Sequence, residues 1–298
     1  MESATTSTVT FGHRIQPSVH QAGALPAGVR RIALRTNGHR HGPITRLVSP
    51  SDIGQHIKPF VFLDHAKIDP RNQPTFGIHP HSGLATLTTV LAGTIAYEDT
   101  TGKKGKLPAG GLEWMKAGNG VWHDGSVMPG EPARVFQLWI ALPASQENSP
   151  PESQYISPSE VHREGPVRVI LGQFGQAKSA IRSPDGINYF HVRLDDGQRW
   201  RYDPPPGHTV AWLAVDQGRL LASESIDAGQ LAVFEKTDTG AIELEAEGAT
   251  SFVIGSAIKH PHPLVLGYYS VHTSAEALAR GEAEIQRIGV ELRRQGRL

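Results

Sequence analysis

The chain of 298 residues contains no cysteine. Disulfide bonds and thiolate ligands are therefore excluded, and a metal ion could be held only by nitrogen and oxygen atoms. Lysine plus arginine equal aspartate plus glutamate at 29 each, so no overall field attracts a polyanion. Direct binding of nucleic acid is not expected, because the one basic stretch near the N-terminus, residues 30–41, resembles a solvated strand and turn rather than a series of phosphate contacts.

Long apolar runs are also missing. The first residues, MESATTSTVTFGHR, have no apolar core of signal-peptide length, and no later run approaches the length of a membrane span. We therefore expect a soluble, cytoplasmic protein without a membrane partner. The chain is long enough for one large domain or two of ordinary size, with a sizeable core.

Glycine (32) and proline (22) interrupt the chain at short intervals, with brief apolar or alternating segments between them. Short strands at this spacing are typical of an all-β sandwich or barrel. In RVFQLWIAL, every second residue from Phe136 to Leu142 shares one face of the expected strand. Every second residue from Val135 to Trp139 shares the other face. The sequence thus predicts an all-β fold.

A polar, proline-rich segment from Pro143 to Pro166 carries no strand pattern and separates two halves with a similar rhythm of strands and glycine turns. We expect an N-terminal domain over 1–148 and a C-terminal domain over 149–298. The second domain should end in a helix, because Thr273 and Glu276 form a capping box before an apolar stripe. That stripe consists of Leu278, Gly281, Ile285, Ile288 and Leu292, and we expect it to pack on a β domain.

Closely spaced histidines make the segment GIHPHSG the first chemical signal. His79 and His81 are two residues apart, so on a strand both side chains leave the same face and could chelate one cation. Pro80 cannot donate to a ladder, which places the pair at a strand start or a sheet edge, near a barrel mouth. His123, after a glycine-rich turn, is the best candidate for a third ligand from another strand. The spacing alone leaves open a pair of polar surface histidines and a hydrogen-bonded core histidine.

Two other triplets are not expected to bind metal. His39 and His41 lie in NGHRHGP, with turn residues on both sides, which predicts a loop. His260 and His262 alternate with prolines in KHPHPLV, which favours an extended connector. Only His272, just before the helix, follows them at hairpin distance.

Four segments together resemble the pirin family of the cupin superfamily: FVFLDHAK, GIHPHSGLATLTTVLAGTIAYEDTTGKKGKLPAGGLEWMKAGNGVWH, FQLWIALP and SVHTSAEALARGEAEIQRIG. The resemblance extends from about residue 30 nearly to the C-terminus. It implies a bicupin, with two β-barrel (cupin, jelly-roll) domains and a C-terminal α-helix, in which only the first barrel carries a metal. It also implies His79, His81 and His123 as ligands of a divalent metal, Fe(II) before Zn, Mn or Ni.

The sequence departs from the family pattern at two positions. Pirins commonly have histidine, one residue, then glutamate in the second motif, but WHDGS places Gly125 where that carboxylate ligand would be. Ala85 stands where a glutamate often follows the first histidine pair. Asp124 is one residue early and on a regular strand points away from His123, so only a bulge at Gly125 would bring it to the metal. Without the glutamate the site stays dipositive and loses its nearest base.

The resemblance implies two classes of function. The first is a non-haem iron dioxygenase of the quercetin 2,3-dioxygenase type, acting on a small aromatic substrate. Flavonol cleavage needs a deprotonated substrate hydroxyl, so the missing glutamate argues against that particular substrate. The second class is a non-catalytic, metal-dependent regulatory protein that binds a protein partner, as a transcription cofactor or enzyme modulator. A cavity open beside the histidines would favour the enzyme, and a closed site with an exposed patch would favour the regulator. The residues leave the catalytic groups and the oligomeric state undetermined.

Overall fold

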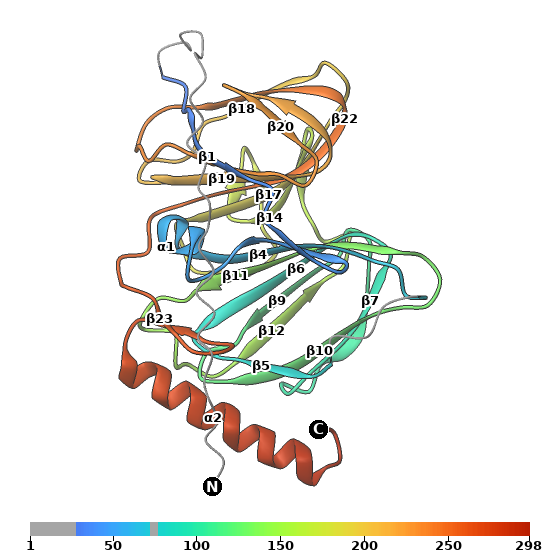
Figure 1. The fold of residues 1–298 in the computed structure, drawn as a ribbon, viewed down its shortest axis with the longest axis vertical. Helices are drawn as coiled ribbons and strands as arrows, with labels where there is room; N and C mark the ends of the chain where they lie inside the picture. Colours follow the sequence, from blue (N-terminus) through green and yellow to red (C-terminus); the bar gives the residue numbers. More distant parts are fainter. Residues whose placement is uncertain (1–27, 72–76) are drawn as a thin grey trace, which may run out of the picture.

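The computed structural model describes residues 28–71 and 77–298. Two β-barrels lie one above the other, and a long helix, α2 (Ala275–Arg294), runs along the far side of the first (Figure 1). The prediction of an all-β fold with a C-terminal helix is confirmed. The N-terminal residues behind the expectation about targeting signals lie outside the described ranges. Within those ranges, no helix combines the length and the apolar character needed to cross a membrane.

The first barrel consists of a seven-stranded sheet, in the order β12-β9-β6-β11-β4-β3-β2, and a four-stranded sheet, in the order β5-β10-β7-β8. Its strands are β2 (His39–His41), β3 (Ile44–Val48), β4 (Phe60–Ile68), β5 (His79–His81), β6 (Leu84–Ala92), β7 (Thr94–Asp99), β8 (Lys104–Pro108), β9 (Leu112–Lys116), β10 (Val121–Val127), β11 (Ala133–Ala141) and β12 (Glu152–Ile156). A short helix that the sequence did not predict, α1 (Ile53–Ile57), joins β3 to β4.

The second barrel is built on a nine-stranded antiparallel sheet, in the order β1-β21-β19-β22-β17-β14-β13, with β18 beside β22 and β20 beside β19. Its strands are β1 (Ile32–Thr36), β13 (Arg163–Glu164), β14 (Val167–Leu171), β17 (Ile187–Leu194), β18 (Arg199–Tyr202), β19 (Val210–Leu221), β20 (Ser225–Asp227), β21 (Leu231–Phe234) and β22 (Ile242–Ala257). Two small hairpins complete the fold: β15 (Gln173–Phe174) with β16 (Ala177–Lys178), and β23 (Val265–Leu266) with β24 (Val271–His272).

The alternation predicted for residues 134–142 is confirmed in β11. Phe136, with every second residue to Leu142, lies in a core shared by the two barrels, which includes Trp212 of the second. Trp212 meets Phe60 there edge to face, with 5.3 Å between ring centroids. The residues of the opposite set, Val135, Gln137 and Trp139, face the interior of the first barrel. The seven-stranded sheet is therefore buried on both faces.

Two strands pair across the predicted domain boundary. β12 lies within the proline-rich segment and pairs with β9 of the first barrel, although that segment was expected to carry no strand. β1 pairs with β21 of the second barrel. The division into 1–148 and 149–298 stays a prediction. A more detailed boundary must account for these two strand pairings.

The expected loop at His39 and His41 is wrong. The triplet forms β2, an exposed strand at the edge of the seven-stranded sheet, paired with β3. Gly42 and Pro43 close a tight hairpin between β2 and β3, and the φ of 56° at Gly42 favours glycine. The predicted turn is present at residues 42–43, but the histidines before it belong to a strand.

The helix cap also differs by one residue from the capping-box prediction. Ser274, not Thr273, is the N-cap, and its hydroxyl accepts from the N–H of Ala277 at 3.1 Å. Thr273 instead donates its N–H and its hydroxyl to the carboxylate of Glu147, at 2.6 and 2.7 Å. The buried face of the helix comprises Ala277, Gly281, Ile285, Gly289 and Leu292.

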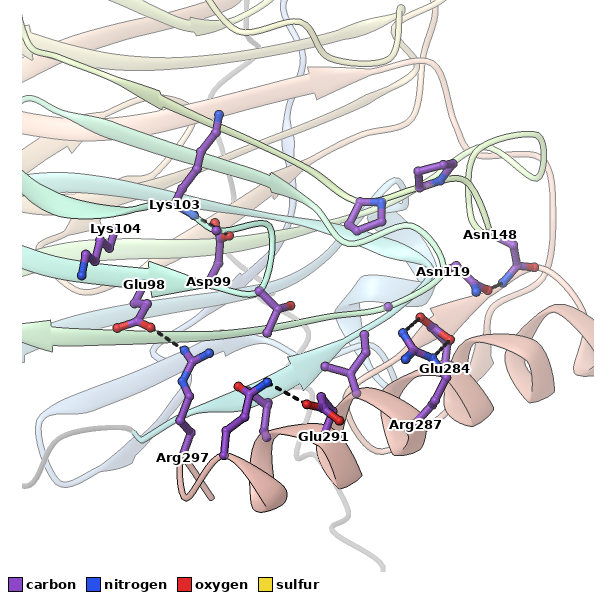
Figure 2. A pocket seen from close by; sticks show the side chains of 18 residues that line it. Glu98, Asp99, Lys103, Lys104, Asn119, Asn148, Glu284, Arg287, Glu291 and Arg297 are labelled. Atoms are coloured by element: carbon purple, nitrogen blue, oxygen red, sulfur yellow. Dashed lines mark hydrogen bonds and ion pairs between the residues drawn. The ribbon is translucent and has the colours of Figure 1, made fainter.

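The second half of α2 and the segment after it border a polar groove of about 700 Å³ beside the β7–β8 turn (Figure 2). The charged groups of this groove pair mainly with one another. Arg297 binds Glu98 of β7, and Arg287 binds Glu284 on the helix itself at 2.8 Å. The Arg297–Glu98 contact attaches the C-terminal end of the chain to the first barrel.

A second attachment lies next to the edge strand β5. The hydroxyl of Ser82 is 2.9 Å from Nε2 of His272, and Nδ1 of that histidine is 3.3 Å from the carboxylate of Glu147. All three side chains are buried. This Ser–His–Glu arrangement has no access to solvent, so it holds the C-terminal segment against the end of β5 rather than offering a nucleophile.

The close approach of α2 to this cluster generates a stability prediction. A methyl group on Gly281 would meet the hydroxyl of Ser82 and lie 2.7 Å from Nε2 of His272. Gly281→Ala should therefore lower the free energy of unfolding by about 1–3 kcal/mol through overpacking, although alanine favours a helix. Urea unfolding measures the change. Ala283→Gly, on the exposed face, should cost only about 1 kcal/mol of helix propensity; a more stable Gly281→Ala protein would contradict the packing described here.

Candidate metal centre

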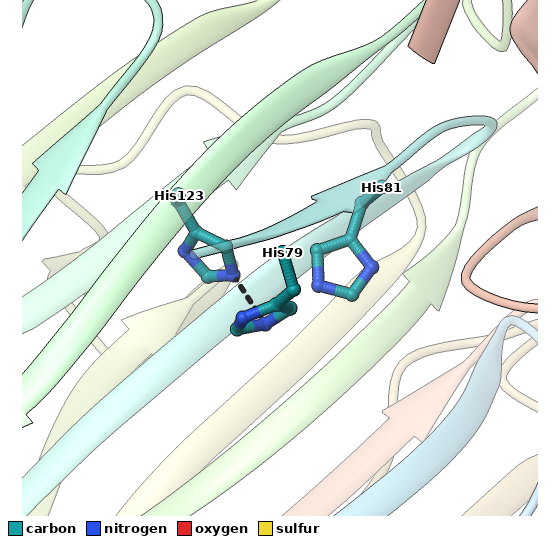
Figure 3. Close-up of side chains that lie close together, drawn as sticks. All are labelled: His79, His81 and His123. Atoms are coloured by element: carbon teal, nitrogen blue, oxygen red, sulfur yellow. Dashed lines mark hydrogen bonds between the residues drawn. The ribbon is translucent and has the colours of Figure 1, made fainter. Parts of the chain in front are cut away.

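Three histidines from two neighbouring strands converge at the mouth of the first barrel. β5 carries His79 and His81, and β10 carries His123, which stands directly opposite His79 in the ladder. One nitrogen of each ring lies within 4.8 Å of the others (Figure 3). β5 is the edge strand of the four-stranded sheet, as expected from Pro80. The structure thus brings together all three predicted site residues.

Hydrogen bonds determine which nitrogen of each ring is available. Nδ1 of His79 lies 2.9 Å from the carbonyl of Gly77, and Nδ1 of His81 lies 3.0 Å from the carbonyl of Tyr269. A carbonyl oxygen can only accept, so in both rings Nδ1 carries the proton and Nε2 keeps its lone pair. Nδ1 of His123 faces a carboxylate oxygen at 3.3 Å, which favours the same tautomer. An outer partner of this kind is typical of metal-ligating histidines.

The donor atoms fit a cation. Nε2 of His123 lies 3.0 Å from Nε2 of His79 (Figure 3), the spacing of two neighbouring ligands about 2.1 Å from a common ion. Burial, with repulsion from His123, lowers the pKa of His79 to about 4. Burial also holds the pKa of His81 well below its usual value. Neutral rings whose lone pairs face each other are unfavourable unless a positive charge lies between them, so this arrangement suits a divalent metal.

A cavity of about 500 Å³ opens beside the three rings. Most of its wall is apolar or aromatic, and polar groups are few. Besides the histidines, it is lined by Ile44, Arg46, Phe62, Asp64, Ala66, Ile68, Thr88, Ile95, Tyr97, Leu107, Glu113, Gly125, Val135, Gln137, Trp139, Tyr268 and Tyr269. This combination of apolar walls and a few convergent polar groups is typical of a small-molecule site.

Aromatic side chains form one side of the cavity. Phe62 and Trp139 stack with ring centroids 4.0 Å apart, and the guanidinium of Arg46 lies 3.9 Å from the centre of the Phe62 ring. Arg46 also forms a bidentate ion pair with Asp64. Tyr268 is 86% exposed at the cavity. A flat, partly polar ligand would find stacking partners here.

Comparison with known proteins identifies the family to which this chain belongs. A model of the pirin family matches residues 43–140. A pirin-like protein of Caulobacter vibrioides is 32% identical over 190 residues, which span 59% of this chain and 67% of that protein. This chain belongs to the pirin family.

Two further comparisons agree with that assignment. A Pseudomonas aeruginosa protein named "putative quercetin 2,3-dioxygenase" is 29% identical over 257 residues, covering 80% of this chain and 89% of that protein. The crystal structure of an Acinetobacter baumannii quercetin 2,3-dioxygenase superposes with a TM-score of 0.78 at 24% identity, covering 87% of this chain and 97% of that one. The fold of this pirin is that of a bicupin.

Gly125 and Ala85, the two positions at which the sequence departs from the expected family pattern, face different parts of the structure. Gly125 lines the cavity, two residues after His123, and the register of β10 with β7 continues through it without a bulge. Asp124 lies on the other face of β10 and does not line the cavity. Ala85 packs in the core between the barrels, so a side chain at that position would point away from the histidines.

Sequence reasoning missed a carboxylate. Glu113 of β9 lines the cavity, and its Oε1 is the atom that faces Nδ1 of His123. Burial alone would raise the pKa of Glu113, but hydrogen bonding and charge attraction from His123, with a hydrogen bond from Thr88, outweigh it and lower that pKa. The segment GLEWMK could have indicated this role. Glu113 alternates with Leu112 and Trp114, which belong to the core between the barrels. Glu113 therefore faces the barrel interior, where a lone acid needs a partner.

The other histidine triplets do not gather ligands. Among the described residues, His79, His81 and His123 are the one group of three whose donor atoms could share a metal. Nε2 of His260 contacts the carbonyl of Leu142 at 3.1 Å. The second HPH run lies in the irregular connector before β23, as predicted.

The ligand assignment generates a prediction about metal content. His79→Ala and His123→Ala should each weaken Zn(II) binding by more than about 100-fold, which exceeds the effect of losing an outer partner. Metal analysis and competition with a chromophoric chelator measure the affinity. The matched double variant His260→Ala/His262→Ala should keep the wild-type affinity. Equal losses in both sets of variants would show that another cluster holds the metal.

Proposed function

We propose that this pirin is a metal-dependent dioxygenase that holds Fe(II) at His79, His81 and His123 and oxidises a small aromatic substrate. The observation that carries the proposal is the cavity of about 500 Å³ beside the three Nε2 atoms. Three neutral histidines are a ligand set on which open iron sites can be built. Iron bound there would supply the one-electron redox chemistry that reactions of dioxygen need.

The side chains of the chain itself would bind and orient the substrate. Tyr268 and Tyr269 offer aromatic surfaces to a planar ring, and the apolar walls exclude water from it. Both faces of Phe62 are already covered, by Trp139 and Arg46. The Gln137 side chain lines the cavity, with its amide oxygen 2.7 Å from the Thr88 hydroxyl, and its amide group can pair with a hydroxyl of the substrate. A small phenol fits these groups better than an aliphatic acid, because the cavity holds aromatic faces and its single guanidinium is already paired with a carboxylate.

The names of the relatives point to flavonols, but the metal site of this chain differs from the pattern expected for pirins. On β10, Asp124 faces away from the cavity, and Gly125 occupies the place where the carboxylate ligand would be. β10 therefore lacks a carboxylate that could take a proton from a flavonol hydroxyl at the metal, and the carboxylate of Glu113 is held by His123 and Thr88. We propose that the preferred substrates are phenols that ionise readily, and that quercetin reacts slowly. The alternative of a purely regulatory protein is less well supported, because it would not require an open cavity.

Oxygen uptake tests the proposal. Protein loaded anaerobically with Fe(II) is mixed with catechols, other phenols, quercetin and phenyl ethers without a free hydroxyl. Uptake should match the loss of phenol mole for mole, with the ethers inactive. His79→Ala should reduce the rate to that of metal-free protein. Stoichiometric iron binding with no uptake for any phenol would reject the enzyme and favour a regulatory role.

A separate prediction concerns the vacant carboxylate position. A side chain at Gly125 enters open space, since its Cβ would meet only Ile95, at 3.8 Å. Gly125→Glu should therefore tighten metal binding by about 10-fold or more, because it adds a charged ligand or outer partner. It should also raise oxygen uptake with quercetin. Gly125→Gln, of the same size but neutral, is the control. Fast quercetin turnover in the wild type, unimproved by Gly125→Glu, would show that this carboxylate is dispensable.

A further inference from the structure

We infer that Glu113 replaces, from the facing sheet, the carboxylate that Gly125 does not provide. In this inference, which rests on the proposed metal site, Glu113 is a positioning residue. It acts through His123, whose ring it orients and whose bound cation it partly neutralises.

The position of Glu113 is determined by strand register. In the seven-stranded sheet it stands directly opposite Thr88 on one side and Tyr155 on the other. The Thr88 hydroxyl donates to Oε2 at 2.5 Å, and Oε1 lies 3.3 Å from Nδ1 of His123, its donor. The Tyr155 hydroxyl lies 3.5 Å from Oε1 but donates its hydrogen to Asp99. Both carboxylate oxygens therefore have donors, and the group is held toward the imidazole.

The buried charge of Glu113 is the second reason for this inference. Glu113 is only 7% exposed, and among the described residues its one ion-pair partner is His123. No lysine or arginine of the described ranges balances it. A buried carboxylate without a cation is strongly unfavourable. The positive charge that suits this position is the imidazole together with a metal on its far nitrogen.

The arrangement around Tyr155 strengthens the orientation. Its hydroxyl donates to Oδ2 of Asp99 at 2.7 Å, while Thr101 donates its N–H and hydroxyl to the other oxygen of Asp99 at 2.7 and 2.5 Å. Tyr155 is also stacked on Tyr97, with 3.5 Å between ring centroids. The tyrosine is thus held in place beside Oε1 of Glu113, which limits the freedom of the carboxylate to turn away from His123.

The two carboxylate positions act on the metal in different ways. A glutamate at position 125 would follow His123 on the same face of β10 and could reach the cation itself. Glu113 lies on the Nδ1 side of the His123 ring, opposite to Nε2, so it acts through the imidazole. Either position adds one negative charge to a dipositive ion. Relocating the charge would preserve the balance of the site and leave a coordination position beside Gly125 open.

A charge swap tests this inference. Zn(II) affinity is measured by chelator competition for the wild type, Glu113→Gln and the double variant Glu113→Gln/Gly125→Glu, and thermal melting of the metal-free proteins reports folding. Glutamine keeps the size of the side chain and can still accept from Nδ1, but it carries no charge. We expect Glu113→Gln to bind Zn(II) about 10–100-fold more weakly, and the double variant to regain most of that loss.

Asp216→Asn is the matched control. Asp216 is also a buried carboxylate paired with a histidine, at 3.0 Å from His65, but that histidine is not a proposed ligand. This variant should keep the wild-type affinity for Zn(II). A folded Glu113→Gln protein with wild-type affinity would overturn the inference alone. A weakened affinity that the carboxylate at position 125 does not restore would also overturn it, because Glu113 would then have only a structural role. A wild type that binds no Zn(II) would overturn the proposed metal site and the inference together.

Discussion

The seven-stranded sheet of the first barrel is buried on both faces, and the rest of the structure depends on that constraint. One face packs against the second barrel, so most of the residues that β4, β6, β9 and β11 direct toward it are apolar, and the buried His65 among them pairs with Asp216. The other face looks into a cavity beside three histidines, where a polar group is tolerated only if it finds a partner. Thr88, Glu113 and Gln137 satisfy this condition by bonding to one another or to His123.

The proposed metal site consequently depends on the whole chain rather than on one motif. Its nitrogen donors come from the small sheet, its carboxylate comes from the large one, and the carbonyl that orients His81 comes from Tyr269, near the C-terminus. The Ser82–His272–Glu147 cluster and helix α2 keep this last segment in place. A disturbance of the terminal segment should thus be felt at His81, although it lies nearly two hundred residues away in the sequence.

Under the proposed role of Glu113, moving the carboxylate would change the chemistry of the site without changing the fold. A glutamate at position 125 would occupy space in the cavity and could bind the cation directly. A glutamate at position 113 leaves that space free and acts through an imidazole. The barrel accommodates both positions, because each faces the same cavity from a different sheet.

Periodicity and residue chemistry, which are local properties, were sufficient to predict much of this protein. The alternation in β11, the edge position of the HPH pair and the C-terminal helix all follow from short-range rules of strand and helix geometry, and the structure bears them out. The joint spacing of the motifs identified the family. The choice among three histidine triplets was also possible, because only one of them has a third histidine at hairpin distance on a strand pattern.

Other features depended on contacts between distant segments. The role of Glu113 could not be predicted, because it arises from the approach of β9 and β10, which belong to different sheets. β12 forms inside a proline-rich segment because β9 offers it an unpaired edge. Ser274 caps α2 because Glu147 engages Thr273 instead. The sequence by itself determined which residues could form strands, a helix and a metal site; only the tertiary structure decided which buried carboxylate faces the histidines, since burial creates the need for a partner and packing selects it.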